Sequence, residues 1–138
     1  MGRAQIFPLL LLPALLYAMI AIPAGGEVAK VMASQAFAMP LASTAEWVVT
    51  WGHVILMFAV IILFVEILKS TTPSAAQMVD NGLAVGMFIV SFVLWLLVRP
   101  FGTTEFFIIV LMCLLDFLAG SVIMTRVSQR TVQYDSTH

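Results

Sequence analysis

The sequence predicts an all-α integral membrane protein, with four transmembrane helices in an up-down bundle and a short interfacial helix between the first two. The chain of 138 residues is 62% hydrophobic and only 9% charged, whereas about a quarter of the residues in a soluble domain are charged. Its mean hydropathy is +1.11. Four apolar stretches also reach the roughly 20 residues that a helix needs to cross about 30 Å of hydrocarbon. Such stretches must be helical, because backbone groups in lipid need partners within their own segment.

The first span is predicted over residues 6–24, IFPLLLLPALLYAMIAIPA. Pro13 lacks a backbone N–H and is expected to kink this helix. A signal peptide is the alternative, because Arg3 precedes the apolar stretch and small residues such as Ala21 and Ala24 follow it. The stretch is longer than the roughly 7 to 15 apolar residues usual for a signal peptide. We therefore favour a retained first span.

The connection after the first span is too long for a simple turn. Apolar residues recur in it near helical spacing, at Val28, Val31, Met32 and Met39. This pattern predicts a short helix over 27–39 that lies on the outer membrane interface and ends at Pro40.

The other three helices are predicted over 47–68, 74–98 and 104–125, followed by a C-terminal tail over 126–138. Ser74 with Gln77 forms a capping-box pattern at the start of the third helix. Thr103 or Thr104, followed by Glu105, is expected to cap the fourth. The connections between these helices are short, so sequential helices should run antiparallel.

Basic residues predict the orientation, because cytoplasmic loops of membrane proteins carry an excess of Lys and Arg. Arg3, Lys69, Arg126 and Arg130 fall on one side, and Lys30 and Arg99 on the other. We therefore expect a bacterial inner-membrane protein with both termini in the cytoplasm. The tryptophans then form an aromatic belt near the outer surface. This belt consists of Trp47, Trp51, Trp95 and Phe101.

Small residues mark surfaces where helices can approach closely in lipid. Gly82 and Gly86 form a GxxxG pair on the third helix, and Gly120 lies in a small-residue stretch of the fourth. We expect these glycines to serve packing within the chain. Contact with a partner subunit is the alternative.

Asp116 is the most unusual residue, because it lies near the centre of the apolar stretch VLMCLLDFLAG. A charged side chain at that depth costs about 2.5–3.5 kcal/mol on insertion scales. We expect an interhelical hydrogen bond to offset this cost. The alternatives are a proton or ion relay and a polar contact with a partner or cofactor. Lys69 and Arg126 are placed at the inner surface, so a buried salt bridge is not expected.

His53 is the second candidate. A helical projection of the second helix and the residue before it places four side chains on one stripe: Glu46, Thr50, His53 and Met57. We expect this stripe to face the bundle. We favour a hydrogen-bonded packing role. The alternative is an axial ligand to haem or a chlorophyll-type pigment. Counting residues from the helix ends gives Tyr17, Ser91 and Cys113 a depth similar to that of His53. These residues form one layer, whereas a proton relay needs polar groups at successive depths.

The remaining acids near the predicted inner surface suggest ordinary roles. Glu66 is expected to form a weak helical pair with Lys69 or to extend to the interface. Asp80 lies beside Asn81 and is expected to cap its helix or to approach Lys69 or Arg126. The sequence shows no catalytic triad, paired-carboxylate site or metal-binding spacing. A net charge of −1 and a single cysteine give no indication of nucleic-acid binding or an intrachain disulfide.

The segments FVEILKSTTPSAAQMVDNGLAVGMF and TTEFFIIVLMCLLDFLAGSVIM resemble an uncharacterised family of small four-span bacterial inner-membrane proteins. The resemblance covers residues 47–125. It implies that three acids recur in the family, and these correspond here to Glu66, Asp80 and Asp116. Asn81 stands where the family pattern has a histidine, which argues against a metal or relay site at that loop. The resemblance implies no activity.

These observations predict a non-enzymatic accessory, structural or assembly subunit of a larger membrane complex. Its expected partners are the lipid bilayer and either other membrane subunits or further copies of itself. One alternative is a small oligomeric transporter or channel that uses Asp116. The other is a pigment- or haem-binding subunit through His53; no other cofactor or metal site is predicted.

Overall fold

The computed structural model describes residues 7–71 and 75–136, and it contains four helices long and apolar enough to cross a membrane. These candidate spans are Leu11–Ala33, Trp51–Ser70, Ala75–Leu97 and Thr104–Ile123. The elements in chain order are α2 (Leu11–Ala24), the 3-10 turn η1 (Gly25–Glu27), α3 (Val28–Ala33), β1 (Gln35–Pro40), β2 (Glu46–Thr50), α4 (Trp51–Ser70), α5 (Ala75–Leu97), the 3-10 turn η2 (Arg99–Phe101) and α6 (Thr104–Ser136). The predicted set of four apolar helices is confirmed.

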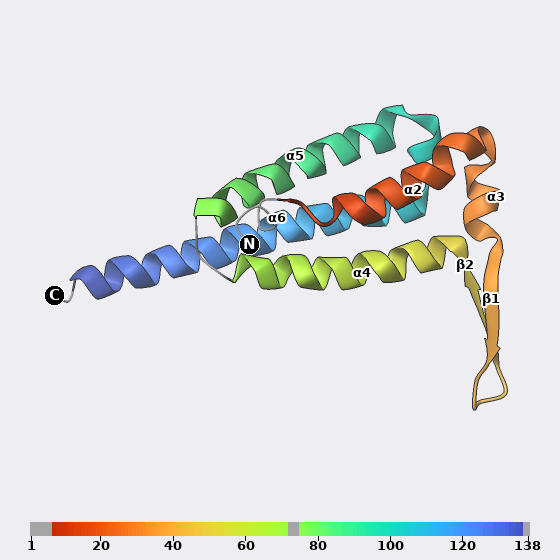
Figure 1. The fold of residues 1–138 in the computed structure, drawn as a ribbon, viewed down its shortest axis with the longest axis horizontal. Helices are drawn as coiled ribbons and strands as arrows, with labels where there is room; N and C mark the ends of the chain where they lie inside the picture. Colours follow the sequence, from red (N-terminus) through yellow and green to blue (C-terminus); the bar gives the residue numbers. More distant parts are fainter. Residues whose placement is uncertain (1–6, 72–74, 137–138) are drawn as a thin grey trace.

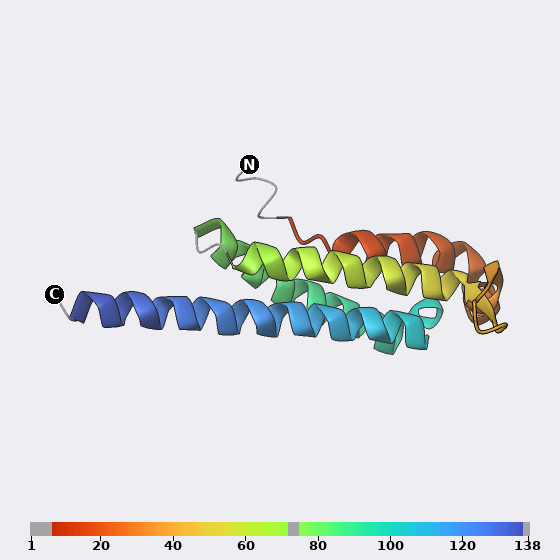
Figure 2. The same cartoon turned by 90° about the horizontal axis from the view of Figure 1, so that it is seen from below.

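The four long helices run alternately up and down (Figure 1). α6 packs extensively against both α5 and α4, whereas α4 and α5 have little contact with each other. Figure 2 shows α6 running along one side of the bundle and continuing past the other helices. The buried core contains residues from α2, α4 and α6, among them Tyr17, Ala21, Ile55, Ala59, Phe106, Ile109 and Cys113.

The first helix differs from its prediction at its N-terminal end. α2 begins at Leu11, so Pro13 lies in its first turn. The first four N–H groups of a helix have no partner within it, and Pro13 therefore removes no intrahelical hydrogen bond. The predicted kink at Pro13 is wrong. The alternative of a signal peptide rested partly on Arg3, which lies outside the described residues.

The connection between α2 and α4 is the largest departure from the prediction. Only Val28–Ala33 forms the expected short helix, and Gln35–Pro40 is a strand that pairs antiparallel with Glu46–Thr50. The second helix accordingly begins at Trp51, not at residue 47. The alternation of Phe37 and Met39 with small residues suits a strand, and edge-to-face contact between the rings of Phe37 and Trp47 links the two strands.

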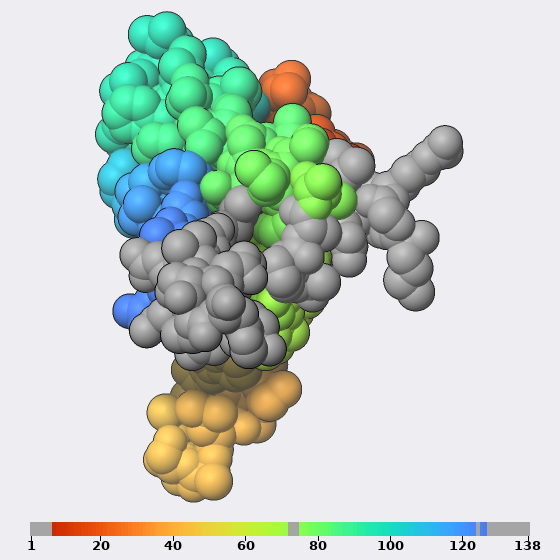
Figure 3. Space-filling view, turned by 90° about the vertical axis from the view of Figure 1, so that its left-hand side faces the viewer, coloured from red at the N-terminus to blue at the C-terminus, as the bar shows by residue number. Residues whose placement is uncertain are grey.

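The hairpin extends sideways from one end of the bundle (Figure 1), which we call the hairpin end; the opposite end, which carries the α4–α5 connection, is the polar end. Figure 3 looks along the bundle from the polar end and shows the hairpin projecting beyond the outline of the helices. The predicted aromatic belt agrees with this arrangement. Trp47 and Trp51 lie where the hairpin joins α4, and Trp95 lies near the last turn of α5 at the same end.

Local capping fixes where two of the helices begin. The Thr50 side chain accepts a hydrogen bond from the backbone N–H of His53, which starts α4. The Thr103 side chain accepts one from Phe106 N–H, as predicted for the fourth helix. α6 continues to Ser136, so the predicted tail is helical over most of its length. The cap predicted at Ser74 lies outside the described residues.

The glycines divide into two kinds. A Cβ added at Gly82 or Gly86 would meet no atom within 4 Å, so the expectation that this pair packs within the chain is wrong. These glycines lie on an exposed side of α5. Gly120 does serve internal packing, because a Cβ there would clash with Asn81 Oδ1.

Gly120→Ala should lower the free energy of unfolding by about 1 kcal/mol, the usual net contribution of one hydrogen bond. The new methyl group must displace the Asn81 side chain, which donates to Ser121 Oγ at 3.2 Å. Unfolding in mixed detergent micelles measures the change. Gly82→Ala is the matched control, since its methyl group meets open space. Equal stability of the two variants would contradict this account of Gly120.

Candidate functional site

The fold brings four ionisable side chains from three helices together toward the polar end. Glu66 and Lys69 belong to α4, Asp80 to α5 and Asp116 to α6. Glu66 and Lys69 are three residues apart and therefore lie on one face of their helix. Because α6 packs against both α4 and α5, this face meets Asp80 and Asp116. We call these four residues the carboxyl cluster.

Lys69 is the only cation of the carboxyl cluster. Its Nζ lies 3.2 Å from Glu66 Oε1 and 3.5 Å from Asp80 Oδ1, and it donates to the backbone carbonyl of Phe7 at 2.8 Å. The backbone N–H of Leu9 also donates to Glu66 Oε1. The segment before α2 thus covers the α4 side of the cluster with one backbone donor and one backbone acceptor.

The three acids of the cluster are almost entirely buried. The exposed fraction is 1% for Glu66, 3% for Asp80 and 5% for Asp116. Asp116 interacts with the charges of all three other members, and its carboxyl group is hydrogen-bonded to that of Glu66. Asp80 Oδ1 is buried and has no hydrogen-bond partner among the described residues, because its distance from Lys69 Nζ is longer than a good hydrogen bond.

The cluster corrects two expectations and confirms two others. Lys69 is not a surface residue, because its side chain is only 14% exposed. Lys69 forms buried ion pairs with Glu66 and Asp80, whereas none with Asp116 occurs among the described residues. The predicted helical pair of Glu66 with Lys69 is confirmed. Glu66 is nevertheless not an interface residue, because it is 1% exposed and also contacts Asp116 and the Leu9 backbone. The predicted approach of Asp80 to Lys69 is confirmed.

A second group of polar side chains adjoins the cluster toward the polar end. Ser70 donates to the backbone carbonyl of Glu66 and accepts from Gln77 Nε2. Asn81 donates to Ser121 on α6. Sequence reasoning gave these residues no joint role, because their positions on separate helices become related only when α6 lies between α4 and α5.

The predicted layer of Tyr17, Ser91 and Cys113 is divided in the structure. The Tyr17 hydroxyl donates to the carbonyl of Pro100 at 3.0 Å and shares a hydrogen bond with the Thr103 hydroxyl, which ties α2 to the start of α6. Ser91 is hydrogen-bonded to Cys113, which links α5 to α6. Both contacts serve helix packing.

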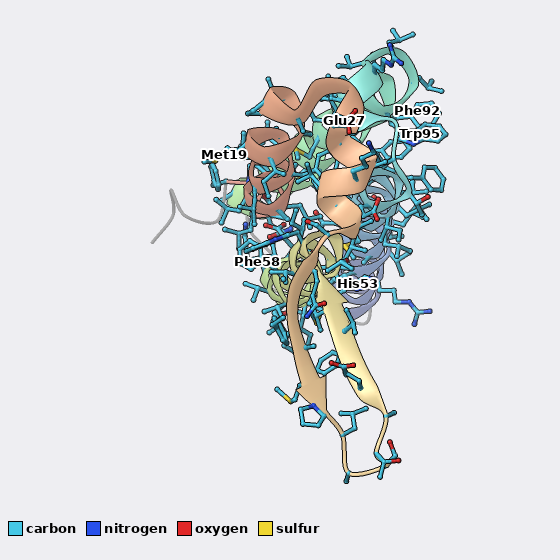
Figure 4. The ribbon with its side chains drawn as sticks, turned by 90° about the vertical axis from the view of Figure 1, so that its right-hand side faces the viewer. Met19, Glu27, His53, Phe58, Phe92 and Trp95 are labelled. Carbon is cyan, nitrogen blue, oxygen red and sulfur yellow. The ribbon has the colours of Figure 1, made fainter. Side chains whose placement is uncertain are left out.

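His53 lies on the outside of the bundle at the foot of the hairpin (Figure 4), so the expectation that its stripe faces the bundle is wrong. Its Nδ1 accepts a hydrogen bond from the backbone N–H of Thr50 at 3.2 Å. A neutral imidazole that accepts at Nδ1 carries its proton on Nε2 and has no second lone pair for a metal. This geometry argues against His53 as an axial ligand.

The described residues contain no group of three or more His, Cys, Asp or Glu side chains arranged to hold a metal ion. The acids of the cluster instead contact Lys69 and the Leu9 backbone N–H, and the carboxyl groups of Glu66 and Asp116 adjoin each other. Such an arrangement suits the retention of a proton or a stable ion pair more than multivalent metal binding.

Comparisons of the chain with protein-family models, with curated proteins and with solved structures found no match. The resemblance of residues 47–125 to a family of small four-span membrane proteins therefore stays a prediction. The three acids that carried the resemblance, Glu66, Asp80 and Asp116, nevertheless lie together in one cluster.

Proposed function

We propose that this protein is a non-enzymatic accessory or assembly subunit of a bacterial inner-membrane complex and that it acts through contacts in and at the edge of the bilayer. The observation that carries the proposal is the β1–β2 hairpin. It projects from the bundle, and the rest of the described chain does not cover its large apolar side chains. The exposed set comprises Phe37, Met39, Leu41, Trp47 and Val48.

The chemistry of the hairpin favours a protein partner with an apolar surface. Residues 35–50 carry a single charge, at Glu46. An isolated two-stranded hairpin is marginally stable in water, and an exposed strand edge is a ready template for pairing with another chain. Exposed aromatic residues are also the side chains most enriched at the centres of interfaces. A hairpin of this kind gains stability when a partner covers it.

The bundle itself favours a structural role over transport. A transporter that used Asp116 would need water to reach its carboxyl group, but the residue is only 5% exposed in the structure. Its hydrogen bond to Glu66 closes the site further. The polar groups at the centre of the bundle are thus engaged with one another.

We further propose that the polar end lies in the cytoplasm and the hairpin end faces outward. Arg126 is exposed beyond the fourth span at the polar end, whereas Lys30 and Arg99 belong to elements of the hairpin end. The excess of positive charge on cytoplasmic segments favours this orientation. The hairpin would then lie at the outer membrane surface, beside the tryptophan belt.

A photo-crosslinking amino acid at Phe37 or Trp47 tests the proposal in native membranes. We expect each position to give one discrete product with a second membrane protein, and the same product from both. The matched control is the same probe at Met19, which is exposed on the outward side of α2 (Figure 4). It should react mainly with lipid. Crosslinks to lipid alone from all three positions would contradict the accessory role.

A further inference from the structure

We propose that Glu66 and Asp116 form a buried proton-binding site, in which the two carboxyl groups share one proton. This site is separate from the hairpin surface and does not depend on the accessory role. The proton comes from water at the polar end and binds a carboxylate oxygen. No other bond forms or breaks.

Charge balance is the first argument for the site. The carboxyl cluster contains three acids and one lysine, so the fully ionised cluster would carry two uncompensated negative charges. All three acids are at least 95% buried. Buried charges that lack partners are strongly destabilising. The groups facing the pair are Lys69 from α4, Asp80 from α5 and the backbone of Phe7 and Leu9, and Lys69 is the only cation among them.

The contacts of Lys69 show which acid lacks compensation. An ammonium group has three N–H donors. Lys69 Nζ donates to Glu66 Oε1 and to the Phe7 carbonyl, and it forms a longer ion pair with Asp80 Oδ1 at 3.5 Å. Among the described residues it forms no ion pair with Asp116, whose carboxyl group adjoins that of Glu66. Two ionised carboxylates that adjoin each other have no donor between them and repel each other, so the charge balance of the cluster favours a proton on one of them.

A second observation is the weakly compensated oxygen of Asp80. Its Oδ1 atom is buried, and its contact with Lys69 Nζ, at 3.5 Å, is an ion pair without a hydrogen bond. Gly120, Asn81 and Ser70 lie close together. Asp116 precedes Gly120 by four residues, and Glu66 precedes Ser70 by four. Both acids therefore lie about 6 Å farther from the polar end along their helices. Asp80 adjoins Asn81, so its carboxyl group lies between the polar end and the Glu66–Asp116 pair. This is the position at which an incoming proton would first be accepted.

Infrared spectroscopy of the purified protein, in a detergent without ester carbonyl groups, tests the proposal. At neutral pH we expect a carbonyl stretching band of a protonated carboxylic acid. Labelling with carboxyl-¹³C aspartate or glutamate should shift this band in the unsubstituted protein, which requires no variant to fold. Asp116→Asn should remove the band, and Glu66→Gln should change its frequency.

Glu46→Gln is the matched control, because Glu46 is exposed on the hairpin. This substitution should leave the band unchanged. Absence of a protonated carboxylic acid band at neutral pH would overturn the proposal. A band that shifts with neither isotopic label would overturn it as well. A band lost in Asp116→Asn but retained in Glu46→Gln supports it.

Discussion

Lys69→Met should lower the free energy of unfolding by about 3–5 kcal/mol, the usual cost of removing one partner of a buried ion pair. Methionine preserves most of the length and apolar character of the lysine stem, so the main loss is the ammonium charge. That charge lies 3.2 Å from Glu66 and 3.5 Å from Asp80, both of which are buried. Unfolding by increasing dodecyl sulfate in mixed micelles, followed by circular dichroism, measures the difference.

Lys30→Met is the matched control for this prediction. Lys30 also pairs with a glutamate three residues away, at 3.0 Å, but its side chain is 83% exposed. Exposed ion pairs contribute little to stability, so Lys30→Met should behave like the unsubstituted protein. Lys69→Met combined with Asp80→Asn should regain part of the loss, because one uncompensated acid is removed together with the lysine. Equal losses for Lys69→Met and Lys30→Met would show that the cluster does not depend on its cation.

Gly52→Val should lower the free energy of unfolding by about 1–3 kcal/mol, the usual effect of overpacking. A Cβ at this position would lie 2.9 Å from Glu105 Cγ and 3.1 Å from the backbone oxygen of Met32. The glutamate side chain can move, but the backbone of α3 can move only if α3 separates from α4. The same micelle unfolding experiment measures the effect.

Gly86→Val provides the comparison, because a Cβ at Gly86 meets nothing within 4 Å. Both substitutions replace glycine with valine in a helix, and valine is the better helix former, so helix propensity does not predict a loss for either variant. Gly52→Val should be clearly the less stable of the two. If Gly86→Val were equally unstable, the contact with α3 would not explain the loss.

The sequence was sufficient for the four helices but not for the hairpin. Spans of 20 or more apolar residues leave no alternative to helix in lipid. The segment 27–40 is short, and short apolar segments fit helical and strand periods about equally well. Its pairing partner EWVVT was assigned to the second helix, although adjacent valines favour strands. The sequence therefore contains a signal for the hairpin, but it can be recognised only when the two strand segments are considered together.

The candidate site could be predicted one residue at a time but not as a cluster. The cost of burying a carboxylate identified Asp116 from its neighbours in the chain. Which side chains surround it depends on α6 lying between α4 and α5, and helical periodicity does not specify neighbours. The prediction that the His53 stripe faces the bundle was wrong for a local reason. Glu46 lies on a strand, and a helical projection that starts there does not describe α4.

The packing of α6 against both α4 and α5 has a consequence for biosynthesis. The ribosome makes α4 and α5 before α6, and chains fold as they are synthesised. Glu66, Lys69 and Asp80 are therefore synthesised before Asp116 and the helix that covers them. The nascent three-helix intermediate exposes charged groups that the finished bundle encloses. Insertion of the fourth helix is thus the step that makes the protein compatible with lipid.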